Sequence, residues 1–229
     1  MGQKVSPLLL RLGFIKNWQS VWYADKKDYA KNVLEDNKIR RYIKAKFVQA
    51  AVSKVIIERM ASQIKVRICS ARPGVIIGRR GADIDKLKEE LNKITNKEVA
   101  IDIEEVKNPS IDAQLIGQSI AMQLEKRVAF RRAMKRSIEQ AMSSGAQGVK
   151  ISCAGRLGGA EMSRRETYKV GKLPLQTLRA DIDYGFAEAL TTYGILGIKV
   201  WVYKGDVIPE SKKVSKPKSA IEASVAGGA

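Results

Sequence analysis

The chain has 229 residues, among them 42 lysines and arginines against 24 aspartates and glutamates, and its formal net charge is +18. This excess favours a polyanionic partner, above all nucleic acid, because uncompensated like charges repel one another. The apolar runs are too short to span a membrane, and no signal peptide is expected. Since the chain lacks histidine, a Cys-x-x-Cys pair and a P-loop motif, we predict no catalytic residues, metal site or cofactor.

The first stretch, to about Lys38, has no regular apolar period, and residues 1–37 are expected to form an N-terminal arm. Basic and aromatic residues are interleaved along it, namely Arg11, Lys16, Trp18, Trp22, Tyr23, Lys26 and Lys27. Such a mixture suits RNA, since cations pair with phosphates while aromatic rings stack on bases. It equally suits an arm whose rings pack onto their own domain, and the two interpretations are compatible.

The following segment mixes helical and extended patterns. Apolar residues recur at helical spacing from Lys38 to Ala50 and from Asp83 to Thr95. Segments 52–59, 63–70 and 100–106 have the patterns of strands. With a short apolar run before the second long helix, the predicted order is helix, strand, strand, helix, helix, strand.

A glycine-bracketed basic loop, Gly78-Arg79-Arg80-Gly81, directly precedes that second long helix. Glycine lets one backbone approach another, a helix N-terminus offers N–H groups to a phosphate, and arginine adds charge. Alone, such a segment is often an ordinary turn. Within this order of elements it resembles the backbone clamp of a type II KH domain. We therefore expect a KH domain over residues 38–107, with Gly78, Arg79, Arg80 and Gly81 binding RNA.

A domain boundary is predicted at Asn108-Pro109, because the residue before a proline is pushed out of helical geometry. A helical region then runs from Asp112 to about Ser144, broken near Val128. Basic residues recur on one side of its second half, at Arg127, Arg131, Arg132, Lys135 and Arg136. The opposite side is apolar, with Phe130, Met134, Ile138 and Met142. Because solvated helix faces usually mix charges, we interpret the basic side as a phosphate-binding face rather than a merely soluble one.

Beyond Gly145 the pattern becomes that of strands, over 148–155, 181–191 and 195–203, with a turn at 156–159 and a polar, basic stretch at 162–170. Further RNA-facing residues are expected at Arg156, Arg164 and Arg165. An antiparallel sheet packed against the preceding helices is predicted, so that residues 108–207 form a second α+β domain. Residues 208–229 lack an apolar period and are expected to be a disordered tail.

The two cysteines, Cys69 and Cys153, each lie in a strand-like run. They are compatible with one disulfide, but two buried and reduced thiols are the favoured interpretation.

Several longer motifs are similar to those of one family, that of protein three of the bacterial small ribosomal subunit. They lie in the family's order and cover the chain to about Gly205, at residues 1–5, 71–74, 77–81, 130–136, 155–161, 177–184 and 192–194. The segment from Ser6 to Leu10 differs from the family pattern, which usually has His or Asn and then a glycine-containing turn. Thr191 also differs, since His is frequent there.

The resemblance implies a cytoplasmic protein that acts in the ribosome, in the head of the small subunit, and that is not an enzyme. It implies binding to 16S rRNA, contacts with small-subunit proteins ten and fourteen, and no free homo-oligomer. The basic helix would line the channel through which mRNA enters, so that Arg131, Arg132 and Lys135 touch mRNA and help to hold and open it.

Two other hypotheses come from different classes of protein. One is a KH-type RNA regulator or RNA-decay accessory factor outside the ribosome. The other is an enzyme acting on nucleic acid, against which the absence of histidine, of a P-loop and of clustered acids argues.

Overall fold

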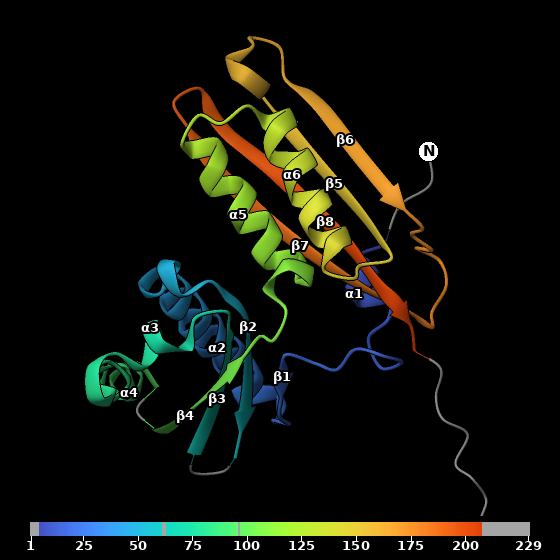
Figure 1. Cartoon of the computed structure of the whole chain (residues 1–229). Helices are drawn as coiled ribbons and strands as arrows, with labels where there is room; N and C mark the ends of the chain where they lie inside the picture. The colour runs from blue at the N-terminus through green and yellow to red at the C-terminus, as the bar shows by residue number, and fades with distance from the viewer. Residues whose placement is uncertain (1–4, 61–62, 96, 208–229) are drawn as a thin grey trace, which may run out of the picture.

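The computed structural model describes residues 5–60, 63–95 and 97–207, which form two α+β domains preceded by an arm (Figure 1). The predicted α+β class and the order of the two domains are confirmed. The tail predicted for residues 208–229 lies outside the described residues, as does the side chain of Arg80.

The first domain packs three helices on one face of a small sheet. Its elements are α2 (Lys26–Lys46), a 3₁₀ turn (Val48–Ala50), β2 (Val52–Arg59), β3 (Gln63–Ser70), α3 (Pro73–Ile77), α4 (Ala82–Thr95) and β4 (Glu98–Glu105). Strand β2 pairs antiparallel with β3, and β3 pairs parallel with β4. Alternate strand residues and the apolar sides of α2 and α4 form the core. The elements follow the predicted order of helix, strand, strand, helix, helix, strand, which is thereby confirmed.

The first helix is longer than its sequence pattern indicated. It begins at Lys26, whereas we expected an irregular arm to about Lys38 and a helix only from there. Its first turns are solvent-exposed, and its first fully buried apolar residue is Ile39. Because those turns bury almost nothing, they leave no apolar period in the sequence, while their lysines, alanine and leucine favour helix intrinsically.

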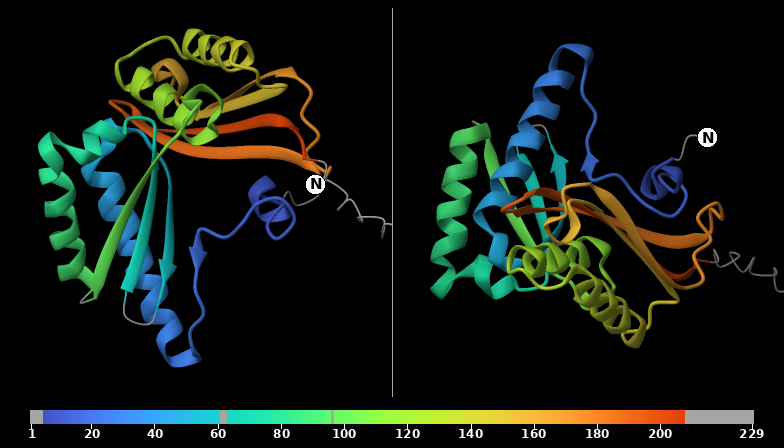
Figure 2. Two further views of the ribbon diagram at one scale, coloured as in Figure 1. Left: turned by 60° about the horizontal axis from the view of Figure 1, so that its bottom comes forward. Right: turned by 90° about the horizontal axis from the view of Figure 1, so that it is seen from above.

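The N-terminal arm contacts both domains (Figure 2). Its short helix α1 (Pro7–Leu10) packs beside β7 of the second domain, and its strand β1 (Ser20–Val21) adds to the first sheet in parallel with β2. Arg11, which follows α1, is fully buried. Its guanidinium donates hydrogen bonds to five carbonyl oxygens, those of Pro7, Pro174, Leu175, Thr177 and Ala180.

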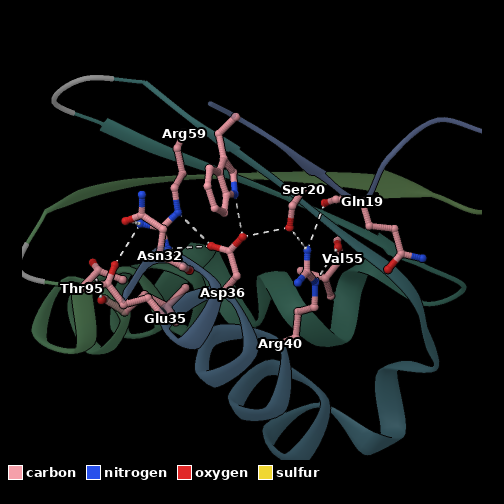
Figure 3. A network of polar contacts seen from close by, with 11 residues as sticks. Gln19, Ser20, Asn32, Glu35, Asp36, Arg40, Val55, Arg59 and Thr95 are labelled. Atoms are coloured by element: carbon pink, nitrogen blue, oxygen red, sulfur yellow. Dashed lines mark hydrogen bonds and ion pairs between the residues drawn. The ribbon is translucent and has the colours of Figure 1, made fainter. Parts of the chain in front are cut away.

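A network centred on Asp36 fixes the other end of the arm (Figure 3). The Asp36 carboxylate, which is 1% exposed, accepts hydrogen bonds from Ser20 Oγ and Trp22 Nε1, each 2.8 Å away. It also accepts from Arg59 of β2, at 2.6 Å from Nη2. Trp22 therefore packs on its own domain, as one of the two interpretations required. Trp18 and Tyr23, at 61% and 94% exposure, remain open to solvent.

The second domain packs two helices on one face of a four-stranded sheet. Its elements are α5 (Ala113–Glu125), α6 (Phe130–Ser143), β5 (Gly148–Gly155), β6 (Arg164–Gly171), β7 (Ala180–Thr191) and β8 (Gly194–Asp206). The strand order is β6-β5-β8-β7. Every pair is antiparallel, which confirms the predicted antiparallel sheet. Strand β6 was not among the predicted strands. It lies at the edge of the sheet and is mostly exposed, so its apolar alternation is weak.

Both cysteines are free thiols. Cys153 is fully buried under the helices, and burial raises the pKa of its thiol to about 12. Cys69 is only partly buried, so the expectation of two buried thiols holds for Cys153 alone.

Candidate nucleic-acid interface

The Gly78–Gly81 loop has a backbone that only glycine adopts readily. Gly78 has φ 70° and ψ −172°, and Gly81 has φ 84°. Residues Arg79 to Gly81 form one 3₁₀ turn that leads directly into α4. Buried Ile76 anchors the loop in the core, while Arg79 is exposed to solvent. The loop therefore presents its backbone and at least one cation outward from a fixed base.

The acidic side chain of Asp83, in the first turn of α4, lies against this loop. A Cβ atom added to Gly78 would lie 2.0 Å from Oδ2 of Asp83, so the carboxylate packs directly against the glycine backbone. Asp83 and Asp85 both lie in the first turn of α4, where acids stabilise the helix dipole. Negative charge already occupies the helix start, which makes that position less suited to a phosphate than the loop backbone and the exposed Arg79.

Helix α6 has one basic side and one apolar side, as predicted. Met134 and Ile138 are buried in the core of the second domain, and Phe130 and Met142 pack against that core. The basic residues of the helix, Arg131, Arg132, Lys135 and Arg136, are all exposed. The buried side fixes the orientation of the helix, so these cations project together into solvent.

The start of α6 strengthens this positive field. Ala129 precedes the helix without a side-chain cap, and the first turn contains no acid. It contains Arg131 and Arg132 instead, although cations at a helix N-terminus are unfavourable by a few tenths of a kcal/mol. One anion at the start of α6 would therefore accept hydrogen bonds from the uncapped N–H groups and also pair with the two guanidiniums.

Arg127 does not lie on this helix, which corrects the expectation from its spacing. It has φ 60° and follows the end of α5, where its N–H donates to Leu124 O and the next N–H, of Val128, donates to Gln123 O. This is a Schellman motif, in which glycine is the usual residue at the left-handed position. Arg127 therefore ends α5, and its exposed side chain belongs to the link between the helices.

Arg131 is the one basic residue of α6 that has an acidic partner among the described residues. Arg131 and Arg164 of β6 approach the same oxygen of Glu166, at 3.6 and 3.7 Å. Both guanidiniums also lie 5.7 Å from the ring of Phe130. One carboxylate shared by two cations leaves this cluster with a net positive charge.

The two other predicted arginines differ in their surroundings. Arg165 is exposed on the edge strand β6. Arg156 donates from Nε to Ala160 O at 2.9 Å and lies against the ring of Tyr193. Arg156 thus holds the 156–160 turn, while Arg165 is free to face a partner. Figure 1 places the α3–α4 loop in the first domain and α6 in the second, so the two basic sites belong to different domains.

The described residues contain no group of three or more Cys, Asp or Glu able to hold a metal ion. Within the same ranges, no helix is both long and apolar enough to cross a bilayer.

These features define a two-domain α+β protein of the KH class, and comparisons with known proteins agree. The family model described as KH domain matches residues 38–111. The model described as ribosomal protein S3, C-terminal domain, matches residues 120–202.

Curated relatives match almost the whole chain. Small ribosomal subunit protein uS3 of Desulforamulus reducens is 57% identical over 213 residues, covering 93% of this chain and 96% of its own. The uS3 protein of Carboxydothermus hydrogenoformans is 57% identical over 215 residues, with 94% and 97% covered. That of Clostridium botulinum strain Okra is 58% identical over 221 residues, with 96% and 99% covered. The chain therefore belongs to the uS3 family of small-subunit ribosomal proteins, which is structural rather than enzymatic.

Proposed function

We propose that this chain binds 16S rRNA in the head of the small ribosomal subunit of the cytoplasm and that α6 contacts mRNA where it enters. Arg131, Arg132 and Lys135 hold the incoming strand and help to open its structure. Proteins ten and fourteen of the small subunit are its proposed neighbours, and no free homo-oligomer is expected. Membership in the uS3 family favours this role over an RNA regulator outside the ribosome.

The observation that carries the proposal is the exposed side of α6. Arg132, Lys135 and Arg136 have no carboxylate within 4.0 Å among the described residues, and the helix start lacks acid and cap. Like charges placed side by side cost stability in the free protein. A polyanion removes that cost, because it neutralises the cations and releases its own counterions.

The Gly78–Gly81 loop is the proposed second contact with RNA. Its glycine backbone and exposed Arg79 suit the backbone of a strand rather than a base edge. The additional residues Arg127, Arg136 and Arg164 extend the positive surface around α6. Arg156 contributes mainly to the shape of its turn, and Arg165, paired with Ala154 of β5, lies on the opposite face of the sheet.

The test compares translation of structured and unstructured messages by reconstituted ribosomes. Arg131→Ala, Arg132→Ala and Lys135→Ala together should leave assembly intact, slow translation through structured messages, and change the rate on unstructured ones little. A matched control removes three exposed cations of the first domain, Lys38, Lys88 and Lys93, and should behave as the unmodified protein. Equal rates on both messages for the α6 variant would refute the proposed role.

A further inference from the structure

The second sheet has a face that its helices leave uncovered. Val149, Ile151 and Cys153 of β5 point into the core beneath α5 and α6. The alternate residues, Lys150 and Ser152, must therefore point to the opposite face. The arm covers the part of that face near Ala180 and Ile182. On the remainder Ser152 is buried, three residues are half-buried and three are exposed, respectively Lys150, Tyr184 and Trp201, and Lys169, Phe186 and Lys199.

The strand register aligns basic and aromatic residues across this face. Lys150 is paired with Lys169 of β6 on one side and with Trp201 of β8 on the other. Trp201 is in turn paired with Tyr184 of β7. One row across the four strands therefore reads Lys169, Lys150, Trp201, Tyr184. The ammonium of Lys150 lies 5.1 Å from the ring of Trp201, and the two rings are 5.5 Å apart.

A second row lies two residues further along the strands. Ser152 is paired with Thr167 and with Lys199, and Lys199 is paired with Phe186. The Phe186 ring is 42% exposed and Lys199 is exposed beside it. Rows two residues apart along a strand lie roughly 7 Å apart, a distance that successive nucleotides of an extended strand can span.

The charges of this face are not compensated by the protein. None of Lys150, Lys169 and Lys199 has a carboxylate within 4.0 Å in the part of the chain that the structure describes. The sheet of the first domain provides the contrast. There Arg67 lies 3.3 Å from Glu58 and 3.5 Å from Asp102, and Lys65 also pairs with Asp102. One sheet thus neutralises its own charges, whereas the other leaves three lysines without an acidic partner among the described residues, two of them, Lys150 and Lys199, beside aromatic rings.

We propose that this surface binds a single-stranded segment of RNA. The open sheet face, as we call it, consists of Lys150, Lys169, Lys199, Tyr184, Phe186 and Trp201. Its lysines contact phosphates, and its rings stack on bases, a combination typical of single-strand binding. The surface is separate from α6, which packs on the opposite face of the same sheet, so it adds a second RNA contact to this domain.

Charge selects RNA over the chain's own tail as the occupant. Residues 208–229 contain Lys212, Lys213, Lys216 and Lys218 against Glu210 and Glu222, so their net charge has the same sign as that of the face. A nucleic acid has the opposite sign and also supplies flat bases for the rings.

The test uses the full chain and a twelve-nucleotide oligouridylate that contains 4-thiouridine. After irradiation, mass spectrometry should locate cross-links at Tyr184, Phe186 or Trp201, in addition to those near α6. Replacing Lys150, Lys169 and Lys199 by Gln should reduce the cross-links at the rings at least tenfold at 0.1 M salt, because each phosphate contact contributes a salt slope of about 0.7. The α6 variant should lose only its own cross-links, so the two proposals fail separately.

Two controls keep the result specific. Replacing Lys38, Lys88 and Lys93 by Gln removes the same charge from the first domain and should leave the ring cross-links unchanged; an equal loss there would overturn the proposal. In assembled small subunits, a lysine-reactive cross-linker decides between occupants. Links from Lys150 or Lys199 to another protein, or to Lys212 of the tail, would also overturn it, as would an absence of ring cross-links in the unmodified chain.

Discussion

Ser53 of β2 donates a hydrogen bond to Asp112 across the boundary between the domains, with 2.5 Å between Oγ and Oδ2. The other carboxylate oxygen, Oδ1, accepts from the N–H groups of Gln114 and Leu115 and so caps α5. Both side chains are buried, at 6% and 5% exposure. A single carboxylate therefore starts a helix of the second domain and ties it to a strand of the first.

Removing that carboxylate should cost more than removing its partner. Asp112→Ala loses the cap and leaves Ser53 unpaired, so we expect a loss of about 3 kcal/mol in the free energy of unfolding. Ser53→Ala loses only the bond between domains and should cost about 1 kcal/mol. Asp112→Asn keeps a capping oxygen and should be the mildest change at that position. Urea unfolding of the three variants checks this order, and equal losses for Asp112→Ala and Asp112→Asn would contradict the capping role.

Arg11→Met should release the arm from the second domain. The substitution leaves the five carbonyl acceptors of the buried guanidinium without their donor, at a cost of about 3 kcal/mol or more. We expect faster hydrogen exchange and new protease cleavage in residues 5–19, with the core of the first domain still protected. Lys16→Met, which removes the ion pair with Asp181 and an attraction to Asp183 but leaves every Arg11 hydrogen bond in place, serves as the control and should change the protection of the arm little. Unchanged protection of the arm in Arg11→Met would show that these bonds do not hold it.

The two glycines of the basic loop should respond differently to alanine. At Gly81 no atom of the described residues lies within 4 Å of an added Cβ, so Gly81→Ala meets only the backbone penalty of about 1 kcal/mol. At Gly78 the new Cβ also meets Asp83, in a region of φ and ψ that is nearly restricted to glycine. Gly78→Ala should therefore cost more. Combining it with Asp83→Ala should recover part of the loss, and additive effects in this double-mutant cycle would exclude the clash.

Asp183 should make stability depend on acid pH. Burial alone would raise the pKa of its carboxyl, but Lys54, Lys204, Lys16 and the N–H of Ala113 together hold the pKa below its ordinary value. A carboxyl whose pKa is lower in the folded state adds stability above its unfolded pKa of about 3.9, and this stability is lost as the pH falls through the folded pKa. Asp183→Asn should thus be less stable than the unmodified chain at pH 7, and the difference should shrink below about pH 4. Urea midpoints between pH 7 and pH 3 measure it; a constant difference would speak against the charge interaction.

Sequence periodicity predicted those elements that bury one side. The ends of β2, β3 and β5 coincide with their predicted bounds, because alternate residues of these strands are buried. The first turns of α2 and the edge strand β6 were missed, since exposed segments carry no such pattern. The basic face of α6 followed from helical spacing, whereas the placement of Arg127 required knowledge of its positive φ.

Contacts between distant segments had no signal in the sequence. Arg11 resembled one more RNA-binding cation of the arm, yet it is a buried structural residue bound to carbonyls more than 160 positions later. Trp22 likewise donates a hydrogen bond to Asp36 of its own domain, and Asp112 accepts one from Ser53 across the domain boundary. Composition cannot separate a cation that meets RNA from one that meets the protein's own backbone, because both need the same side chain.

The arm gives the two domains a second connection in addition to the linker between them. Starting from Arg11 on the second domain, the chain passes through β1 on the first sheet, through the first domain, and back through the linker before Asp112 to the second domain. Two bodies joined by one linker can turn about it, but a second tie on the far side resists that rotation. A torque applied to α6 would therefore be shared between the linker and the arm, and the Gly78–Gly81 loop would move with α6 rather than independently of it.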